Sequence, residues 1–509
     1  MGSGVAHSLR FTGDHRRSTA NASSSTLFPQ RTMSGMPKPL KILLYAVAAL
    51  ASVLVLAALA VLVFVDPDDY RPRVEAAMSK AFGMTVTIEG KMGVRFIPLL
   101  NISLANVRVL NQGSELAFVK AGNIDIALLP LLQGEIHYGN ISTTGSRLSI
   151  TRDRDGRYNY QLPPAASQTF RPLQLPKITF DDLVVSYTDK QSAHSVESGS
   201  CNGELTDLRH PGGAPLMKRL STAGKFACME LRSKNTVLND LKFSVAATDG
   251  VYDFKPVTML AFGGQGSGTM RIDRSGELPL YQIAYALTKF RIEDLFKAQS
   301  SGKSIRGQVD FSTTLSMRGH GRREMRQSAS GEMSLSGTNL SLAGIDLDQQ
   351  LAKFASSQNL NLFDVSALLF AGPVGLAVAK GYDFSGLSEK NAGTTQIRTV
   401  ISKWNVEKGV AHAKDVALAT SQNRLAIHGS LDFVDDRFQD VTVALLDAAG
   451  CAKAQQKISG PFAKPIVDKS NILIPIGPLL KFIDKAKTLI TGSAAKCEVF
   501  YSGAVAQPG

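Results

Sequence analysis

The chain has 509 residues, 44% of them hydrophobic and 19% charged, a balance that excludes a disordered protein and leaves room for several domains. It has a single tryptophan and no clusters of arginine with aromatic residues, which argues against carbohydrate-stacking and nucleic-acid-binding surfaces. The net charge is +13, and part of it comes from residues 1–41, where six basic side chains stand against one acid. We therefore expect no nucleic-acid partner and an ordinary soluble surface on the remainder.

An uncharged apolar run at residues 42–65 predicts a transmembrane helix. At about 1.5 Å per residue, the run is long enough to cross the hydrocarbon core of a bilayer, which is about 30 Å thick. A cleavable signal peptide would have a shorter apolar region followed by small residues at a cleavage site. Because basic residues precede the run, the positive-inside rule predicts a basic, disordered cytoplasmic tail at 1–41, a single-pass anchor at 42–65 and an extracytoplasmic remainder.

The segment that follows the anchor has the residues of a helix start. Acidic residues stand on both sides of Pro67, which suits the first turn of a helix and the positive end of its dipole. Apolar residues then recur at helical spacing as far as Gly83. We expect a short amphipathic helix that ends at this glycine.

From residue 84 onward the hydrophobic period changes to two, which is typical of strands with one apolar face. Turn signals separate these segments at Asp155-Gly156, Asp249-Gly250, Ser275-Gly276 and Ser336-Gly337. Helical patterns are few, at 346–355 and 477–490. The sequence therefore predicts a mainly β protein, an antiparallel sheet with a few short helices. So few helices cannot cover a long apolar face, which must close on itself or meet something that is not protein.

Four cysteines, Cys201, Cys228, Cys451 and Cys497, all follow the predicted anchor, on the side of the membrane that favours oxidation. None forms a Cys-x-x-Cys pair, so zinc-binding and redox motifs are poorly supported. Of the three possible pairings we favour Cys201–Cys228 and Cys451–Cys497, because each joins neighbours within one region. Free buried thiols are the alternative.

The sequence carries no recognisable catalytic machinery: it lacks a nucleophile elbow, a phosphate-binding loop and a His-Glu-x-x-His motif. Asp153 and Asp155 begin like a calcium loop, but the spacing fails and Asp155-Gly156 is better interpreted as a hairpin turn. The glycine cluster at 263–268 is not followed by a helix, so we interpret it as a turn or bulge. We expect no enzymatic activity, no cofactor and no metal.

Short motifs follow one another along most of the chain. They are DPDDY at 66–70, TIEG at 87–90, FIP at 96–98, LPLLQG at 129–134, RDGRYNY at 154–160, GEMSL at 331–335, GIDL at 344–347, ISG at 458–460 and CEVFYSG at 497–503. In this order they resemble the AsmA family, although family members usually have tryptophan where Tyr160 stands. Each motif is weak alone, and their common order gives the resemblance its weight.

The resemblance implies a bacterial inner-membrane protein whose bulk lies in the periplasm and which serves outer-membrane biogenesis. It implies an elongated, curved sheet, a groove or open barrel, with an N-terminal groove region at 66–330 and a C-terminal domain at 331–509. AsmA-like proteins look like relatives of bridge-like lipid transfer proteins, so phospholipid or another acyl lipid is the expected ligand. A periplasmic or outer-membrane protein is a candidate partner.

If the sheet forms a groove, alternating apolar residues should line it. The candidates are Ile124, Ile126, Leu128, Leu148, Ile150, Val185 and Tyr187. The alternative is a sheet filled by its own side chains, in a non-enzymatic scaffold or assembly factor for outer-membrane proteins. The sequence does not separate these two hypotheses.

Overall fold

The computed structural model describes residues 52, 66–95, 100–127, 130, 137–161, 172–212, 216–234, 236–298, 305–344, 346–357, 362, 393–469, 471–472 and 497–508. The expected anchor at 42–65 lies outside these residues except for Ser52, and Leu128 and the expected helix at 477–490 lie outside them altogether. None of the helices within the described ranges combines the length and the apolar character that a bilayer span requires.

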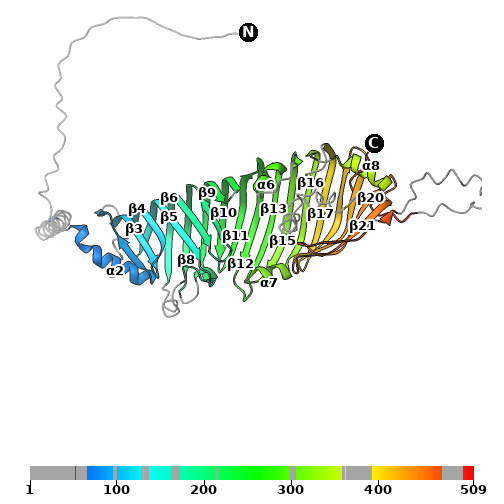
Figure 1. The fold of residues 1–509 in the computed structure, drawn as a ribbon. Helices are drawn as coiled ribbons and strands as arrows, with labels where there is room; N and C mark the ends of the chain where they lie inside the picture. The colour runs from blue at the N-terminus through cyan, green and yellow to red at the C-terminus, as the bar shows by residue number, and fades with distance from the viewer. Residues whose placement is uncertain are drawn as a thin grey trace, which may run out of the picture. The chain divides into compact units, whose positions relative to one another are not determined.

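Residues Pro67–Gly509 form one compact unit, to which the residues before Pro67 do not belong. In the described part of the larger unit all strands join one 23-stranded sheet, which continues across residue 330 (Figure 1). The strands are β1 (Thr85–Ile88), β2 (Met92–Arg95), β3 (Leu100–Asn111), β4 (Ser114–Ile126), β5 (Tyr138–Arg152), β6 (Leu173–Asp189), β7 (His194–Ser198), β8 (Cys201–His210), β9 (Ser221–Ser233), β10 (Thr236–Thr248), β11 (Val251–Ala261), β12 (Gly264–Asp273), β13 (Leu280–Arg291), β14 (Ile305–Arg306), β15 (Gln308–Arg318), β16 (Ser330–Ala343), β17 (Thr394–Glu407), β18 (Val410–Thr420), β19 (Arg424–Asp432), β20 (Arg437–Leu446), β21 (Ala452–Pro461), β22 (Ile466–Val467) and β23 (Asn471–Ile472).

The long strands follow one another across the sheet in chain order and pair antiparallel, as the alternating pattern predicts, except at β5 and β6. These two strands are parallel, with Ile141 beside Ile178 and Ile150 beside Tyr187. Two successive strands can be parallel only if the chain crosses back to the level at which the first strand began. Residues 153–172 connect the end of β5 to the beginning of β6. The expectation of a wholly antiparallel sheet is therefore wrong at this pair.

The first helix begins later than its sequence pattern suggests. Residues Pro67–Tyr70 form a 3₁₀ turn, η1, and the α-helix α2 then runs from Arg71 to Phe82. The Asp68 carboxylate accepts hydrogen bonds from Arg71 Nη2 (2.7 Å) and from the backbone N–H of Met92 (3.1 Å), so it ties the turn to β2 instead of capping α2. Gly83 ends α2 in the left-handed conformation with φ 67°, which confirms the predicted stop.

The other described helices are short and lie at strand ends. They are α5 (Leu216–Arg219), α6 (Ile292–Ala298), α7 (Arg322–Ser328) and α8 (Leu347–Ser357). Helix α8 confirms the helix expected at 346–355. Helix α6 packs beside β14, α7 beside β15 and α8 beside β17, so together they do not form a layer over the whole sheet (Figure 1).

The predicted turns were right where the chain reverses and wrong where a glycine serves another purpose. Asp249 and Gly250 join β10 to β11 with φ 46° and 84°, as a two-residue hairpin turn requires. Ser336-Gly337 does not turn, because β16 passes straight through it. Gly337 pairs with Val309, and a Cβ on this glycine would lie 2.7 Å from Val309 Cγ1. The glycine therefore permits close packing between strands.

Left-handed Asn and Asp residues interrupt several strands: Asn106 in β3, Asp182 in β6, Asp240 in β10 and Asp440 in β20, with φ of 51°, 55°, 51° and 50°. These residue types tolerate this conformation better than other non-glycine residues. At Asp182 the ladder register shifts, and Phe180 and Leu183 pack in one cluster although they are three positions apart. Such bulges sharpen the twist of a sheet, so these residues mark where the strands bend.

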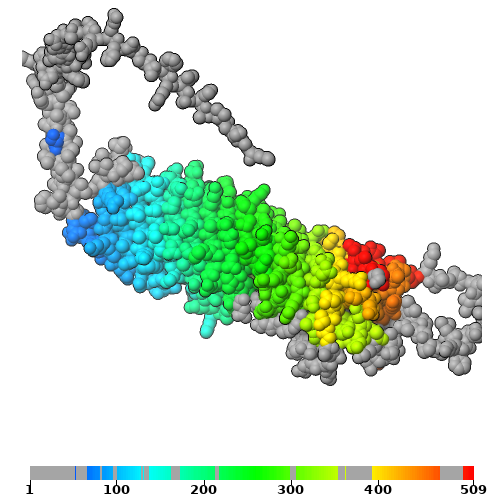
Figure 2. Space-filling view, turned by 90° about the horizontal axis from the view of Figure 1, so that it is seen from above, coloured from blue at the N-terminus to red at the C-terminus, as the bar shows by residue number. Residues whose placement is uncertain are grey.

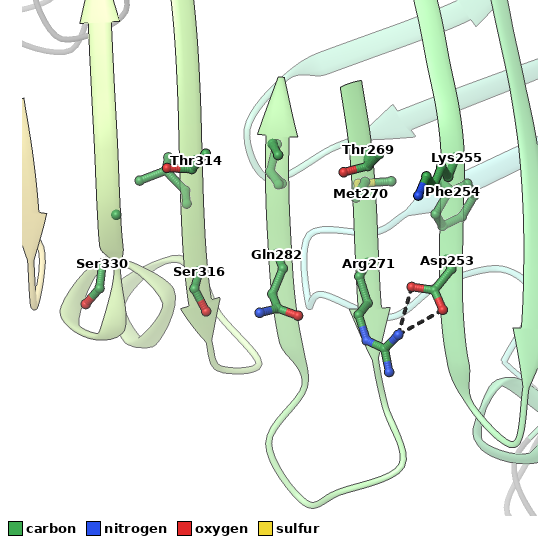
Figure 3. Close-up of a pocket in the computed structure, with 14 residues that line it drawn as sticks. Asp253, Phe254, Lys255, Thr269, Met270, Arg271, Gln282, Thr314, Ser316 and Ser330 are labelled. Carbon is green, nitrogen blue, oxygen red and sulfur yellow. Dashed lines mark hydrogen bonds and ion pairs between the residues drawn. The ribbon is translucent and has the colours of Figure 1, made fainter. Parts of the chain in front are cut away.

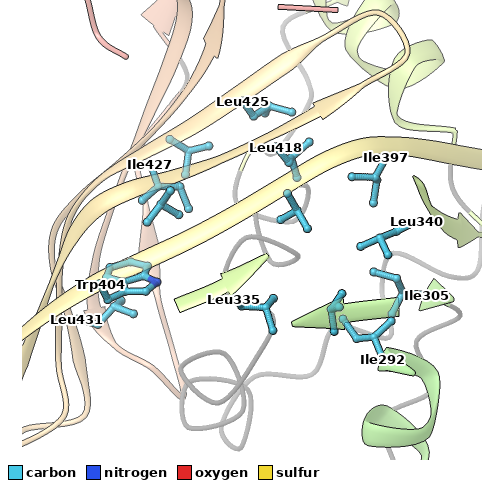
Figure 4. Packing of buried hydrophobic residues seen from close by; sticks show 14 of the residues in the cluster. Ile292, Ile305, Leu335, Leu340, Ile397, Trp404, Leu418, Leu425, Ile427 and Leu431 are labelled. Carbon is cyan, nitrogen blue, oxygen red and sulfur yellow. The ribbon is translucent and has the colours of Figure 1, made fainter. Parts of the chain in front are cut away.

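The largest buried cluster in the described residues lies at the C-terminal end of the sheet, and we call it the C-terminal core. Figure 4 shows its side chains meeting from α6 and from strands between β14 and β19. Trp404 is 1% exposed within it and donates its Nε1–H to Ser402 Oγ at 2.8 Å. Ile292 of α6 and Leu347 of α8 are each 1% exposed, so both helices contribute to this core.

Residues 497–508, the C-terminal strap, cover the opposite face of β18–β20. Small side chains on that face, including Ala417 and Ala444, are buried against Tyr501 and Val505 of the strap. The Tyr501 hydroxyl donates to Asp415 Oδ1 at 2.6 Å. In Figure 2 the strap, in red, lies against the yellow and orange strands. Both faces of the sheet are therefore covered at this end.

Candidate functional site

Apolar residues in the middle of the sheet line up across neighbouring strands in two adjacent rows, which we call the apolar strip. The first row crosses from β5 to β13 through Ile141, Ile178, Leu205, Gly224, Val245, Phe254, Met270 and Ile283. The second crosses from β6 to β13 through Phe180, Gly203, Phe226, Phe243, Val257, Gly268 and Tyr285. Paired residues share a face, so the strip is one continuous surface.

A chain of phenylalanine rings forms the centre of the strip. The ring centroids of Phe180 and Phe226 are 6.0 Å apart, those of Phe226 and Phe243 5.2 Å, and those of Phe243 and Phe254 5.9 Å. Phe180 and Phe226 stand two strands apart, and they can approach because the strand between them places Gly203 there. A Cβ on Gly203 would clash with the ring of Phe226. The glycine thus lets the rings join into one apolar surface.

The strip lacks a helical cover within the described part of the chain. Helices α2, α6, α7 and α8 pack at β1, β14, β15 and β17, and the four-residue α5 reaches only the rim, where Tyr252 donates its hydroxyl to Met217 O at 2.8 Å. Accordingly, every apolar side chain of the strip is half-buried, not fully buried. A half-exposed surface of this length is unusual for a soluble protein and typically marks a binding site.

The opposite face of the same strands is polar. Asp253, Arg271, Gln282, Ser316 and Ser330 form one register row on it, with Arg271 Nη1 2.9 Å from Asp253 Oδ2 (Figure 3). A hollow of about 710 Å³ lies on the polar face, between this row and the neighbouring row of polar side chains. Strip residues line it only where they lie in the strands between the two polar rows. Because side chains alternate between faces, this hollow is a furrow on the polar face and is separate from the strip.

Ion pairs on the polar face are exposed and do not suggest catalysis. Lys177 Nζ lies 2.8 Å from Glu204 Oε2, and the hydrogen bond from Lys177 lowers the pKa of this carboxyl group. Exposed pairs of this kind contribute little to stability, about 0–1 kcal/mol each. The polar face thus keeps the sheet soluble while the apolar face is left for packing or binding.

The structure places the predicted groove residues on the apolar face but in different surroundings. Ile124 packs into the cluster beneath α2, so the chain itself covers it. Leu148 and Val185 pair across β5 and β6 and pack around Cys201 and Cys228. Leu128 lies outside the described residues.

Three further candidates complete the set. Ile126 pairs with Leu100 on the face that Ile124 shares. Ile150 pairs with Tyr187, and both are half-buried. Among the described candidates, Ile124 is the direct cross-strand partner of the strip residue Ile141, at the end of the strip that the cluster beneath α2 covers, whereas Ile150, Val185 and Tyr187 lie farther along the same face of β5 and β6.

Both favoured disulfides form in the structure. Cys201 and Cys228 are direct cross-strand partners of β8 and β9, with Cα atoms 4.0 Å apart, and their side chains lie on the apolar face. Cys451 and Cys497 join β21's beginning to the strap, with Cα atoms 6.1 Å apart. The first bridge cross-links β8 and β9 on the apolar face beside the strip, and the second links the strap to the sheet.

Tyr285 marks the end of the strip. Its ring lies over two glycines of β12, since a Cβ on Gly266 or Gly268 would clash with it. Its side chain packs against the C-terminal core, and burial raises the pKa of its hydroxyl group, which has no hydrogen-bond partner among the described residues. On the far side of Tyr285, the same face of the sheet belongs to the core.

The sequence analysis missed the residues that make up most of the strip, including Phe180, Phe226 and Phe243. Their signal was present as apolar residues alternating with charged or polar ones, but the glycine partners obscured it. We interpreted the cluster at 263–268 as a turn or bulge, whereas only Phe262 and Gly263 turn and the following glycines belong to β12. Cross-strand register was needed to show that Gly266 and Gly268 serve Tyr285.

The fold and the strip define a class of protein: a long single sheet that presents a half-exposed apolar face. The model of the AsmA family matches residues 36–210 and 223–416, which is most of the chain, so the protein belongs to the AsmA family. This confirms the resemblance drawn from the sequence motifs. Neither the curated proteins nor the solved structures include a significant match to it.

Proposed function

We propose that this AsmA family protein binds acyl lipid, phospholipid in the first place, on the apolar strip and passes it on during outer-membrane biogenesis. The observation that carries the proposal is the half-exposed strip, with its phenylalanine chain and without a helical cover in the described residues. When apolar groups cover such a surface and remove it from water, the free energy falls by about 25 cal/mol per Å² of apolar surface buried. A hydrocarbon chain supplies those groups without any need for directional bonds.

Transfer along the strip requires no catalytic residue. An acyl chain that leaves a bilayer for the strip exchanges one apolar environment for another, whereas its passage through water would cost about 0.8 kcal/mol per CH₂ group. The free energy of the exchange is therefore small, and lipid can enter and leave readily. This agrees with the expectation from the sequence that the protein is not an enzyme.

The length of the strip sets its capacity. From β5 the strip passes β6, β8, β9, β10, β11 and β12 to β13, a distance of about 34 Å at about 4.8 Å per strand. One leaflet of a bilayer has a hydrocarbon thickness of about 15 Å, half of the core. The strip can therefore hold the acyl chains of a few lipids, and it is too short to join two membranes by itself.

Family membership supports a membrane-associated bacterial protein. We propose in addition that residues 42–65 anchor it in the inner membrane, with the N-terminus in the cytoplasm and the sheet in the periplasm. Helix α2 follows that segment in the chain and packs beside β1, at the N-terminal end of the sheet. A periplasmic or outer-membrane protein would receive the lipid.

Native mass spectrometry of residues 67–509, purified without detergent from cells, tests the proposal. We expect co-purified phospholipid on the unmodified protein and its loss in Phe243→Asp, which places a charge in the phenylalanine chain. Ser244→Asp is the matched control, because the next residue of β10 points to the polar face. Equal lipid occupancy in both variants, or none in the unmodified protein, would contradict the proposal.

A further inference from the structure

The two rows of the strip lead directly into the C-terminal core. Beyond Tyr285 the second row continues in register through Thr313 and Met333 to Trp404. Exposure falls along this path, from half-buried at Tyr285 to 1% at Trp404. Thr313 and Met333 are still half-buried, so the apolar face is continuous and its row becomes fully buried at β17.

Side chains of the chain itself occupy the face beyond that point. Phe296 of α6 is 5% exposed and Leu351 of α8 is 2% exposed, and both belong to the cluster that contains Trp404. Protein interiors are packed as densely as organic crystals, so an acyl chain could enter only by displacing these helices. The acyl chain would replace apolar contacts between side chains with equivalent contacts. No gain in free energy would offset the disruption of the packed core. The core therefore excludes lipid.

We propose that the apolar strip is a blind track, on which bound acyl chains extend from β5 to β13 and do not enter the buried core around Trp404. This inference rests on the proposed function and specifies how its site is used. Lipid does not run the length of the sheet: it leaves sideways, from the open face of the strip. An acceptor must accordingly approach that open face and not the end of the sheet at β21.

The single tryptophan provides a direct test, because Trp404 stands beyond the proposed end of the track. Three strand steps separate it from Tyr285, about 14 Å, and six separate it from Phe243, about 29 Å. Brominated acyl chains quench tryptophan fluorescence only near contact. The full chain is reconstituted in vesicles of phosphatidylethanolamine and phosphatidylglycerol with either brominated or ordinary acyl chains. The matched variant, Trp404→Phe with Phe243→Trp, moves the reporter into the strip.

We expect brominated lipid to quench Trp at position 243 at least twofold and to leave Trp404 unchanged. Quenching at both positions would overturn the blind track and leave the proposed function standing. Quenching at neither would remove the proposed function and the blind track with it. Should the double variant fail to fold, p-benzoylphenylalanine in place of Phe243 or of Trp404, each in the otherwise unmodified chain, gives the same comparison by photocrosslinking. A lipid adduct at 404 would then overturn the inference.

Discussion

The middle of the sheet, β5–β13, and its C-terminal end, β16–β21, are built from the same ladder but differ in what covers them. In the middle, the apolar strip is half-buried on one face and a polar row occupies the other. At the C-terminal end, α6 and α8 fill one face and the strap covers the other, so that Leu418 on the first face and Ala417 on the second are both 0% exposed. One sheet thus has both a half-exposed apolar surface and a buried core, and the presence or absence of covering elements makes the difference.

Charging the C-terminal core should have the largest effect. Leu418→Asp would bury a carboxylate without a partner, which costs several kcal/mol, a large part of the about 5–15 kcal/mol that stabilises a folded domain. We expect the cooperative unfolding transition of the sheet's C-terminal end to disappear in urea denaturation followed by Trp404 fluorescence. A transition at the unmodified midpoint would show that this end is as open as the strip.

Removing the bridge to the strap should have the next largest effect. Cys497→Ser is expected to lower the free energy of unfolding by about 2–4 kcal/mol, because the bridge closes a long loop in the unfolded chain. Thermal denaturation of the variant and the unmodified protein measures the difference. Cysteine alkylation mapped by mass spectrometry provides the control, and free thiols at both Cys451 and Cys497 without reduction would contradict the assignment.

Charging the edge of the strip should affect lipid more than stability. Ile150→Asp faces the open side beside Tyr187, where water can reach the carboxylate, so we expect a loss of less than about 2 kcal/mol in stability. Co-purified lipid should fall at the same time. Ser149→Asp, on the opposite face of β5, should retain its lipid. A variant at Ile150 that unfolds would mean that the strip is a closed core like the C-terminal end.

The smallest expected effect concerns pH at the strap. His428 stacks on Phe500 of the strap with ring centroids 4.2 Å apart, and desolvation lowers its pKa below the ordinary value of 6.5. The unfolded chain therefore binds the proton more readily, so stability is complete above pH 6.5 and declines as the pH falls below it. We expect a small fall in melting temperature between pH 7.5 and 5.5. The fall should be absent in His428→Asn.

The strands could be predicted from the sequence more completely than the covered C-terminal end. Alternation predicted strands with one apolar face, and it placed Ile150 and Tyr187 together on that face, where they pair. In β18 the unbroken run from Val416 to Thr420 is buried on both faces, a pattern that alternation does not describe. The parallel pairing of β5 and β6 and the ends of the strip depend on contacts distant in sequence, which no local pattern encodes.

The strap also bears on the order in which the chain folds. Tyr501 is 86 residues from its partner Asp415, and Val505 is 81 from Arg424, whereas Asp68 is only 24 residues from Met92 at the other end of the sheet. During synthesis the N-terminal end can therefore complete its packing early. The alanine face of β18–β20 must wait, exposed, until the strap has been made and oxidised. A chaperone or a disulfide-forming enzyme would find its substrate there, in the interval before the last layer closes.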